Sequence, residues 1–398
     1  MNSVLTSPPN ELNVQKLLER VITGNDLDVT ETRFLIKKIM KGEIAHSLTA
    51  GILVALKMKG EAVSELLGGA EVMRDLVKSV DSGLEDLVDL CGTGGDGAQT
   101  FNISTAAMFV AASAGAKVAK HGGRAVSSSS GSADLLECLG ANINLTPEQV
   151  VSSMQNTGVG FMFAPNHHPA MKNVAPVRRE LGTRTMFNIL GPLTNPAKSR
   201  RQLIGVYDKK LLLPIANVLK QLGSTHVLVV HGESGLDEMC FSSRTYYAEL
   251  KKGKITEGTI VSNDLGFDVT SFSNVETAIN VSSVDESKKK VIESLTNKDS
   301  LEAQYVILNA AGALYVAGCC DSVKQGVVMA KGSIASGTAI EKQKNSEYQK
   351  YQISTNKEKF NLSREQEIAF EELIKHDNSF RVHLLQGTTG SGKTIVYF

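Results

Sequence analysis

In the stretch Asp86-Leu87-Val88-Asp89-Leu90-Cys91-Gly92-Thr93-Gly94-Gly95-Asp96-Gly97, a short apolar run leads directly into a cluster of glycines. The run predicts a strand, and residues 102–114, which are rich in small side chains, predict a helix behind the glycines. Glycines between a strand and a helix N-terminus let backbone N–H groups approach an anion closely. Taken alone, the cluster fits a tight strand–helix turn equally well.

Further strands and helices alternate beyond this stretch. Continuous apolar runs at 203–206 and 227–230 predict strands buried on both faces, and Val118-Ala119 predicts another strand. Helical patterns separate the runs, notably 211–222, and residues 306–320 predict a buried helix. Alternating strands and helices favour an α/β domain with a mainly parallel sheet.

The first 80 residues show a different pattern, because their apolar residues follow helical spacing. Residues 12–21 and 34–40 predict two helices, with Thr30 as the N-cap of the second and Gly42 at its end. Residues 48–58 and 62–80 predict two more. We therefore expect a small helical domain at 1–80, joined by a segment near 170–195, and an α/β domain at 81–340.

Bulk composition argues against several classes of protein. The chain has 42 basic and 42 acidic side chains, so its zero net charge gives no electrostatic case for binding nucleic acid or a membrane surface. We find no uncharged apolar stretch of membrane-spanning length and no signal peptide. The five cysteines form no C-x-x-C pair, which favours a reducing cytoplasm over disulfides or a zinc site.

Side chains behind the first glycines suit a phosphorylated ligand. Asn102, Ser104 and Thr105 would lie in the first turn of the helix, where they can reach phosphate oxygens. Asp96 is unusual in an anion-binding loop, but it makes sense if the ligand also carries hydroxyls or Mg²⁺.

A second loop, Lys120-His121-Gly122-Gly123-Arg124, follows the next predicted strand and leads into a run of serines that ends at Ser132. Loops at successive strand ends face one crevice in an open α/β sheet. His121 alone would more often be structural, but the loop as a unit favours anion binding.

Two later segments add charged side chains. His167 and His168 are adjacent, so they point to different sides and cannot share one metal ion. Arg178 is suited to a bidentate pair with a carboxylate, although a surface charge explains it equally well. The prolines of the loop at 188–196 indicate rigid packing. Asp237-Glu238 follows a predicted strand and suits hydrated Mg²⁺, whereas an isolated pair would be a solvated turn.

In this order, these segments resemble those of anthranilate phosphoribosyltransferases over about residues 10–340. The matching segments are 92–96, 102–105, 120–122, 129–134, 168–172, Arg178, 184–196 and 236–238. The resemblance implies a small helical domain plus a larger α/β domain of the nucleoside phosphorylase/phosphoribosyltransferase class, assembled as a homodimer. It also implies transfer of a phosphoribosyl group from phosphoribosyl pyrophosphate to anthranilate, with release of pyrophosphate, in tryptophan biosynthesis.

The same resemblance implies three groups of binding residues and no acid or base catalyst. The phosphoribosyl pyrophosphate site would comprise Gly92, Gly94, Gly95, Asp96, Thr100, Asn102, Ser104, Thr105, Lys120 and Ser132. The anthranilate site would comprise Gly92, His121, Gly123, His168 and Arg178. The Mg²⁺ site would comprise Ser104, Asp237 and Glu238.

Two positions depart from the family pattern. Many members carry Asn where this chain has Gly123, and Lys is common where it has Ser130. Gly123 lacks the side-chain amide with which Asn could contact anthranilate. The phosphate-binding segments are unaffected.

The C-terminal region has a different character. Residues 341–361 contain no Gly or Pro and predict a linker or a poorly ordered helix. Beyond it, Val382-His383-Leu384-Leu385 predicts a strand before a P-loop motif that contains Gly387, Gly392, Lys393 and Thr394. Residues 362–398 resemble the start of the helicase domain of primosomal replication restart helicases. Because the chain ends at Phe398, we expect an incomplete P-loop fragment with negligible ATP binding.

Two other functions are consistent with part of this pattern. A nucleoside phosphorylase of the same fold would use similar loops for free phosphate, but Arg178 and the pair Asp237-Glu238 favour a carboxylate acceptor and a metal-bound diphosphate. A nucleotide-driven nucleic-acid motor would need a Walker B acid beyond Lys393, and the neutral charge argues against it.

Overall fold

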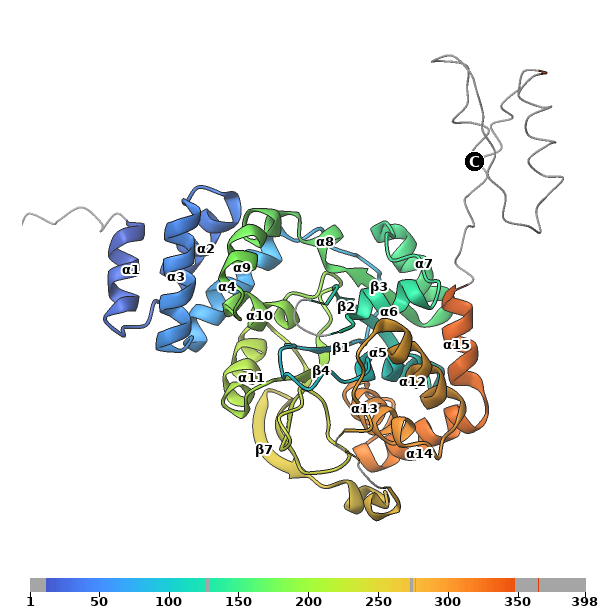
Figure 1. The fold of residues 1–398 in the computed structure, drawn as a ribbon. Coiled ribbons are helices and arrows are strands. Elements are labelled where there is room, and N and C mark those ends of the chain that lie inside the picture. Colours follow the sequence, from blue (N-terminus) through green and yellow to red (C-terminus); the bar gives the residue numbers. More distant parts are fainter. Residues whose placement is uncertain (1–11, 126–128, 273–274, 276, 348–363, 365–398) are drawn as a thin grey trace, which may run out of the picture. The chain divides into compact units, whose positions relative to one another are not determined.

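The computed structural model describes residues 12–125, 129–272, 275, 277–347 and 364. All but the last of these belong to one compact unit, residues 1–350 (Figure 1). The predicted P-loop fragment, with Gly387, Gly392, Lys393 and Thr394, lies outside the described residues, as does most of the predicted linker.

Four helices begin the described chain, as predicted. They are α1 (Val14–Ile22), α2 (Val29–Lys41), α3 (His46–Lys59) and α4 (Val63–Leu76), drawn in blue in Figure 1. Gly42 ends α2 with φ of 74°, as expected of a left-handed cap. The predicted N-cap Thr30 is wrong. Asp28 caps α2, because its carboxylate accepts the Glu31 N–H at 2.8 Å while the Glu31 side chain accepts the Asp28 N–H at 2.9 Å.

A mixed sheet follows the helical bundle. Its strands are β1 (Leu87–Gly92), β2 (Lys117–Gly122), β3 (Val159–Phe163), β4 (Arg201–Gly205), β5 (His226–Gly232), β6 (Thr245–Lys251) and β7 (Lys254–Ile260). Within the described residues the order is β3-β2-β1-β4-β5-β6-β7, parallel as far as β5 and antiparallel from there. The mainly parallel sheet is therefore confirmed.

Helices cover the sheet and connect its strands. They are α5 (Ile103–Ser113), α6 (Ser132–Cys138), α7 (Pro147–Thr157), α8 (Ala164–His167), α9 (Ala175–Leu181), α10 (Met186–Leu190), α11 (Leu212–Gln221), α12 (Val284–Thr296), α13 (Leu301–Ala317), α14 (Val323–Ala335) and α15 (Thr338–Glu347). Helix α15 includes the first residues of the segment 341–361, for which the sequence predicts a linker or a poorly ordered helix.

The central strands are buried on both faces, as their continuous apolar runs predict. Leu228 and Val230 of β5 pack into a core with α5 and α13, whereas Val227 and Val229 pack into a second core with α11 and the helical bundle. Neighbouring residues alternate between cores because strand side chains alternate between faces. The second core also contains Met186, Phe187, Ile189, Leu190 and Leu193, so their segment and the bundle share one hydrophobic cluster.

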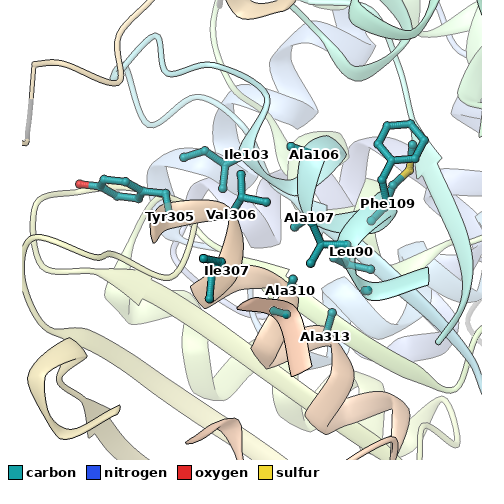
Figure 2. Packing of buried hydrophobic residues seen from close by; sticks show 14 of the residues in the cluster. Leu90, Ile103, Ala106, Ala107, Phe109, Tyr305, Val306, Ile307, Ala310 and Ala313 are labelled. Carbon is teal, nitrogen blue, oxygen red and sulfur yellow. The ribbon is translucent and has the colours of Figure 1, made fainter. Parts of the chain in front are cut away.

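Packing of α5 against α13 fixes the helix that begins behind the first glycine loop. Ala106 and Ala107 of α5 and Ala310 and Ala313 of α13 belong to this interface (Figure 2). All four are completely buried, and such small side chains let two helices approach closely. The N-terminus of α5 is thereby held at the carboxyl end of β1.

The sequence did not predict the hairpin of β6 and β7. Its strands have many partly exposed residues and contain no continuous apolar run. In the described part of the chain, the helices are all too short or too polar to cross a bilayer. The division into domains at 1–80 and 81–340 stays a prediction.

Candidate active site

One cavity of about 350 Å³ lies where the parallel strands end. Residues of both glycine-containing loops line it together with Asp237 and Glu238, which follow β5. The sequence places these segments as far as 146 residues apart (92 to 238), and the parallel sheet brings them to one edge. The prediction that these loops share one crevice is therefore confirmed.

The first glycine loop connects β1 to α5. Gly94 and Gly95 have φ of 65° and 76°, the left-handed region that favours glycine. The Gly94 N–H donates to Asp237 Oδ2 at 2.7 Å, so the loop is already arranged around a carboxyl oxygen. Arg184 donates to the Gly95 carbonyl and lies 4.0 Å from the Tyr207 ring centre, which braces the loop from outside.

Lys120, near the end of β2, is hydrogen-bonded to β1 and to the first turn of α5. Its side chain is nearly inaccessible, with 2% of its surface exposed, and lines the cavity. Its Nζ donates to the Leu90 carbonyl and to Ser104 Oγ at 3.1 Å. A buried ammonium needs nearby negative charge, and both Asp89 and Glu238 lie close enough to interact electrostatically with it.

Asp237 and Glu238 place two carboxylates in the cavity wall. Burial raises the pKa of Asp237 well above its usual value, and the neighbouring charges of Asp96 and Glu238 raise it further. Burial also raises the pKa of Glu238, although Lys120 acts in the opposite direction. Two recessed carboxylates that repel each other favour a bound cation.

The residues present fit Mg²⁺ better than a metal held by protein alone. We find no cluster of three or more His, Cys, Asp or Glu ligands within the described ranges. Mg²⁺ commonly takes only one or two carboxylates and completes its shell with water and substrate phosphate oxygens. Ser104 lies beside the pair, because its N–H donates to Glu238 Oε1 at 3.2 Å. The predicted set Ser104, Asp237 and Glu238 thus lies together.

Gly92 and Gly205 leave space for Asp237 and Glu238, here called the acidic segment. A Cβ on Gly205, at the end of β4, would lie 1.5 Å from the Asp237 carbonyl oxygen, and one on Gly92 would lie 2.3 Å from Asp237 Oδ2. Gly122 is similarly restricted by Ser132 Oγ at 2.2 Å. These positions require glycine for close approach. Gly205 was missed because it looks like an ordinary strand residue in the sequence.

His121 and His168 form a buried pair. Their ring centres are 5.0 Å apart, and each has an Nε2 atom without a hydrogen-bond partner among the described residues. Burial lowers the pKa of His121 well below its usual value and that of His168 to about 4, so both rings are neutral near pH 7. His121 lines the cavity, whereas His168 lies behind it. The direct role expected for His168 therefore stays a prediction.

His167 points elsewhere, as its spacing predicts. Its Nδ1 forms a 2.8 Å hydrogen bond with the Lys78 carbonyl oxygen. The rings of His167 and His168 therefore have different surroundings.

Arg178 lies on the cavity wall without an acidic partner within the described structure. Its Nη2 donates to Asn188 Oδ1 at 3.3 Å, and burial lowers its pKa. The guanidinium keeps its charge nonetheless, because its ordinary pKa is far above neutral. The side chain can therefore pair with the carboxylate of a ligand.

Most of the residues expected to bind ligands line this cavity. They are Gly92, Gly94, Gly95, Asp96, Thr100, Asn102, Ser104, Thr105, Lys120, His121, Gly123, Ser132, Arg178, Asp237 and Glu238. Asn188, Gly191 and Pro192 also line it, although the sequence indicated only packing for their loop. The prolines of this loop predict that it is rigid, but they do not indicate whether it faces solvent or a ligand.

Two family models match the chain between residues 15 and 340. Residues 15–77 match the helical bundle domain of a glycosyl transferase family, and residues 84–340 match its a/b domain. Anthranilate phosphoribosyltransferase of Neisseria meningitidis is 51% identical over 329 residues, which cover 82% of this chain and 93% of that protein. The enzyme of Hydrogenovibrio crunogenus is 49% identical over 329 residues, 82% of this chain and 96% of that protein.

Solved structures agree with this fold. Anthranilate phosphoribosyltransferase from Thermus thermophilus matches with a TM-score of 0.77 and 38% identity, over 83% of this chain and 98% of that one. The Saccharomyces cerevisiae enzyme, solved in complex with phosphoribosyl pyrophosphate and Mg, matches with a TM-score of 0.76 and 24% identity, over 84% of this chain and 98% of that one. Fold, family model and relatives agree that this chain belongs to the anthranilate phosphoribosyltransferase family.

Proposed function

We propose that this chain transfers the phosphoribosyl group of phosphoribosyl pyrophosphate to anthranilate in the cavity described above. The products are N-(5-phosphoribosyl)anthranilate and pyrophosphate, a step of tryptophan biosynthesis. The observation that carries the proposal is that one cavity unites two anion-binding loops, a pair of carboxylates and an arginine that has no acidic partner among the described residues.

The phosphoribosyl pyrophosphate site would be formed by the two loops and the first turn of α5. Backbone N–H groups of the glycine loop and the N-terminus of α5 favour phosphate oxygens. Lys120 adds a positive charge that is already oriented by its bonds to Leu90 and Ser104. Gly94, Gly95, Asp96, Thr100, Asn102, Thr105 and Ser132 would complete this site.

Asp237 and Glu238, with Ser104, would hold Mg²⁺ against the diphosphate. When bound, the metal would add positive charge next to the departing pyrophosphate. Without it, three acids including Asp96 lie close enough to repel one another. Binding of a metal-bound diphosphate would relieve this repulsion.

The anthranilate site would lie on the side of the cavity lined by His121, Gly123 and Arg178. Arg178 would pair with the carboxylate of anthranilate, and neutral His121 would pack beside the ring without adding a second charge. His168 would support His121 from behind. Gly123 places little bulk here, since its nearest neighbour to an added Cβ is the Ala164 side chain at 4.0 Å.

The residues can support the reaction without a strong base. Departure of pyrophosphate leaves positive charge on the ribose and negative charge on the leaving group, which Lys120 and the loop N–H groups stabilise. The amine of anthranilate is already neutral near pH 7, so it can attack without first losing a proton to the protein. Positioning of the two substrates would then supply most of the rate.

The homodimer stays part of the proposal. Ile22 on α1 and Met58 on α3 have 61% and 83% of their surfaces exposed, which is unusual for large apolar side chains in the helical bundle. Light scattering tests the assembly, because a dimer would have twice the 42.7 kDa mass of the chain. A cytoplasmic location also remains a prediction from the cysteine content.

Loss of anthranilate fluorescence in the presence of phosphoribosyl pyrophosphate and Mg²⁺ tests the activity. We expect fluorescence to fall only when the protein and both small molecules are present, and to fall far more slowly in excess chelator. Cleavage of a pyrimidine nucleoside by free phosphate, with no consumption of anthranilate, would instead support the nucleoside phosphorylase alternative.

A further inference from the structure

Residues 279–287, here called the 279–287 brace, pair with the end of the first glycine loop. The Val281 N–H donates to the Gln99 carbonyl at 2.9 Å, and the Phe101 N–H donates to the Ile279 carbonyl at 3.0 Å. Between these bonds Thr100 and Asn280 form an antiparallel bridge. A segment far along the sequence therefore fixes the backbone that leads into α5.

The brace ends at Ser287, in the first turns of α12 and with none of its surface exposed. Its Oγ donates to Asn102 Oδ1 at 2.7 Å and accepts the Asn102 backbone N–H at 3.1 Å. A serine hydroxyl can donate and accept at once, so one side chain satisfies both groups of Asn102. Asn102 is the residue at which the glycine loop becomes helix α5.

The brace also contacts the loop that contains Ser129 and Ser130, here called the serine loop. Ser129 Oγ donates to the Val281 carbonyl at 3.0 Å, and Ser130 Oγ donates to Asn102 Oδ1 at 2.7 Å. In return, Asn102 Nδ2 donates to the Ser130 carbonyl at 3.1 Å. Ser130 is one of the two positions where this sequence departs from the family pattern. Asn102 is thus the point at which both loops and the brace meet.

These bonds determine which end of the Asn102 amide is available to a ligand. Two hydroxyl donors occupy the oxygen, whereas the nitrogen uses one of its two N–H groups on Ser130. The remaining N–H belongs to a residue that lines the cavity. A donor N–H suits a phosphate or sugar oxygen, and the opposite orientation of the amide would present an unfavourable carbonyl oxygen.

We propose that Ser287 is a positioning residue for the phosphoribosyl donor: its hydroxyl holds the Asn102 amide with the N–H toward the cavity and ties the glycine loop to the serine loop. This inference rests on the proposed function, because it requires that Asn102 contact the donor. Ser287 lines no part of the cavity and acts through Asn102.

Steady-state kinetics of Ser287→Ala test the role. We expect KM for phosphoribosyl pyrophosphate to rise about tenfold, as for loss of one or two hydrogen bonds, while KM for anthranilate and kcat stay within about threefold. Ser294→Ala is the matched control. Ser294 lies on the same helix and is also fully buried, but its hydroxyl donates to the Val291 carbonyl at 2.7 Å, within α12. A purely structural role would make the two variants alike.

A double-mutant cycle with Asn102→Ala separates this inference from the proposed function. If Ser287 acts through Asn102, Ser287→Ala should change KM for the donor by less than about threefold in the Asn102→Ala background. A rise in KM for Asn102→Ala but not for Ser287→Ala would overturn the positioning role and leave the donor site standing. No rise for either variant would contradict the donor site itself. Should Ser287→Ala fail to fold, Ser287→Cys carries the same test, because a thiol of similar size is a poor hydrogen-bond partner.

Discussion

Gly92 and Gly205 are register partners at the ends of β1 and β4, and the Asp237 segment lies directly against both. The backbone of Asp237 can approach so closely only because neither position carries a Cβ. Its carboxylate then accepts the Gly94 N–H at 2.7 Å, which orders the glycine loop. The shape of the site thus depends on two residues, Gly92 and Gly205, that have no side chain.

Replacing Gly205 with Ala should damage the site more than the fold. The added Cβ would lie 1.5 Å from the Asp237 carbonyl oxygen, so the acidic segment must move. We expect kcat/KM for phosphoribosyl pyrophosphate to fall at least about 100-fold and unfolding free energy to fall by about 1–3 kcal/mol. Gly332→Ala, in α14 with no atom near an added Cβ, should leave both unchanged or raise stability. Equal activity of the two variants would contradict the packing argument.

The neutral pair His121 and His168 makes stability sensitive to acid. Burial lowers the pKa of His168 to about 4, whereas an unfolded histidine has a pKa of about 6.5. Between these pH values the unfolded chain binds more protons than the folded chain, so lowering the pH decreases the free energy of unfolding. The stability that neutral His168 contributes is therefore present in full above about pH 6.5 and is lost as pH falls toward 4.

Replacing His168 with Gln should flatten this dependence. From about pH 7.5 to about pH 5, the wild-type chain should lose about 2 kcal/mol of unfolding free energy through His168 alone, and the variant should not. Urea titrations at several pH values measure the slope, which is more informative than absolute stability because the substitution also changes packing. His46→Gln, at an exposed position at the start of α3, is the control. An unchanged slope for His168→Gln would exclude the linkage.

At the scale of the element, local signals predicted helices and strands better than their ends. Gly42 was identified because a left-handed cap selects glycine, and β5 because strands buried on both faces read as continuous apolar runs. Thr30 failed as a cap because the Asp28–Glu31 capping box begins α2 earlier. Helix α15 extends into a polar segment without a clear period, and such a composition fits a linker as well as a helix.

The two cap candidates of α2 can be compared directly. Asp28→Ala removes a carboxylate that accepts the Glu31 N–H, and should lower unfolding free energy by about 1 kcal/mol. Thr30→Ala, at an exposed position inside the first turn, should change it by less than about 0.5 kcal/mol. Denaturant unfolding of the two variants gives the comparison. A larger loss for Thr30→Ala would restore the cap expected from the sequence.

The candidate site was predictable where a loop carries its own chemical signal. The glycine loop, Lys120 and the acidic pair were each found from residue types next to a predicted strand. Ser287 and Gly205 were missed because their roles depend on partners that are distant in sequence, Asn102 and Asp237. A serine in a polar helix or a glycine in a strand carries no local mark of such a partner.

At the scale of the whole molecule, the parallel sheet makes a single site from dispersed segments. Strands β1, β2, β4 and β5 run in one direction, so the loops that follow them reach the same edge. Val177 and Leu190 belong to the hydrophobic core that the α9–α10 segment shares with the helical bundle, yet Arg178 and Asn188 of the same segment line the cavity. The α9–α10 segment, which packs with the bundle, therefore supplies one wall of the site, and the loops at the edge of the sheet line most of the rest.

Calorimetric titration of the full chain with phosphoribosyl pyrophosphate, with and without Mg²⁺, measures whether this convergence creates a metal-dependent donor site. We expect the wild-type chain to bind the donor at least about tenfold more tightly with Mg²⁺, and the Asp237→Asn/Glu238→Gln double variant to lose that difference while keeping its fold by circular dichroism. Equal Mg²⁺ enhancement in the folded double variant would contradict the account, because the acidic pair would then have no part in holding the metal-bound diphosphate.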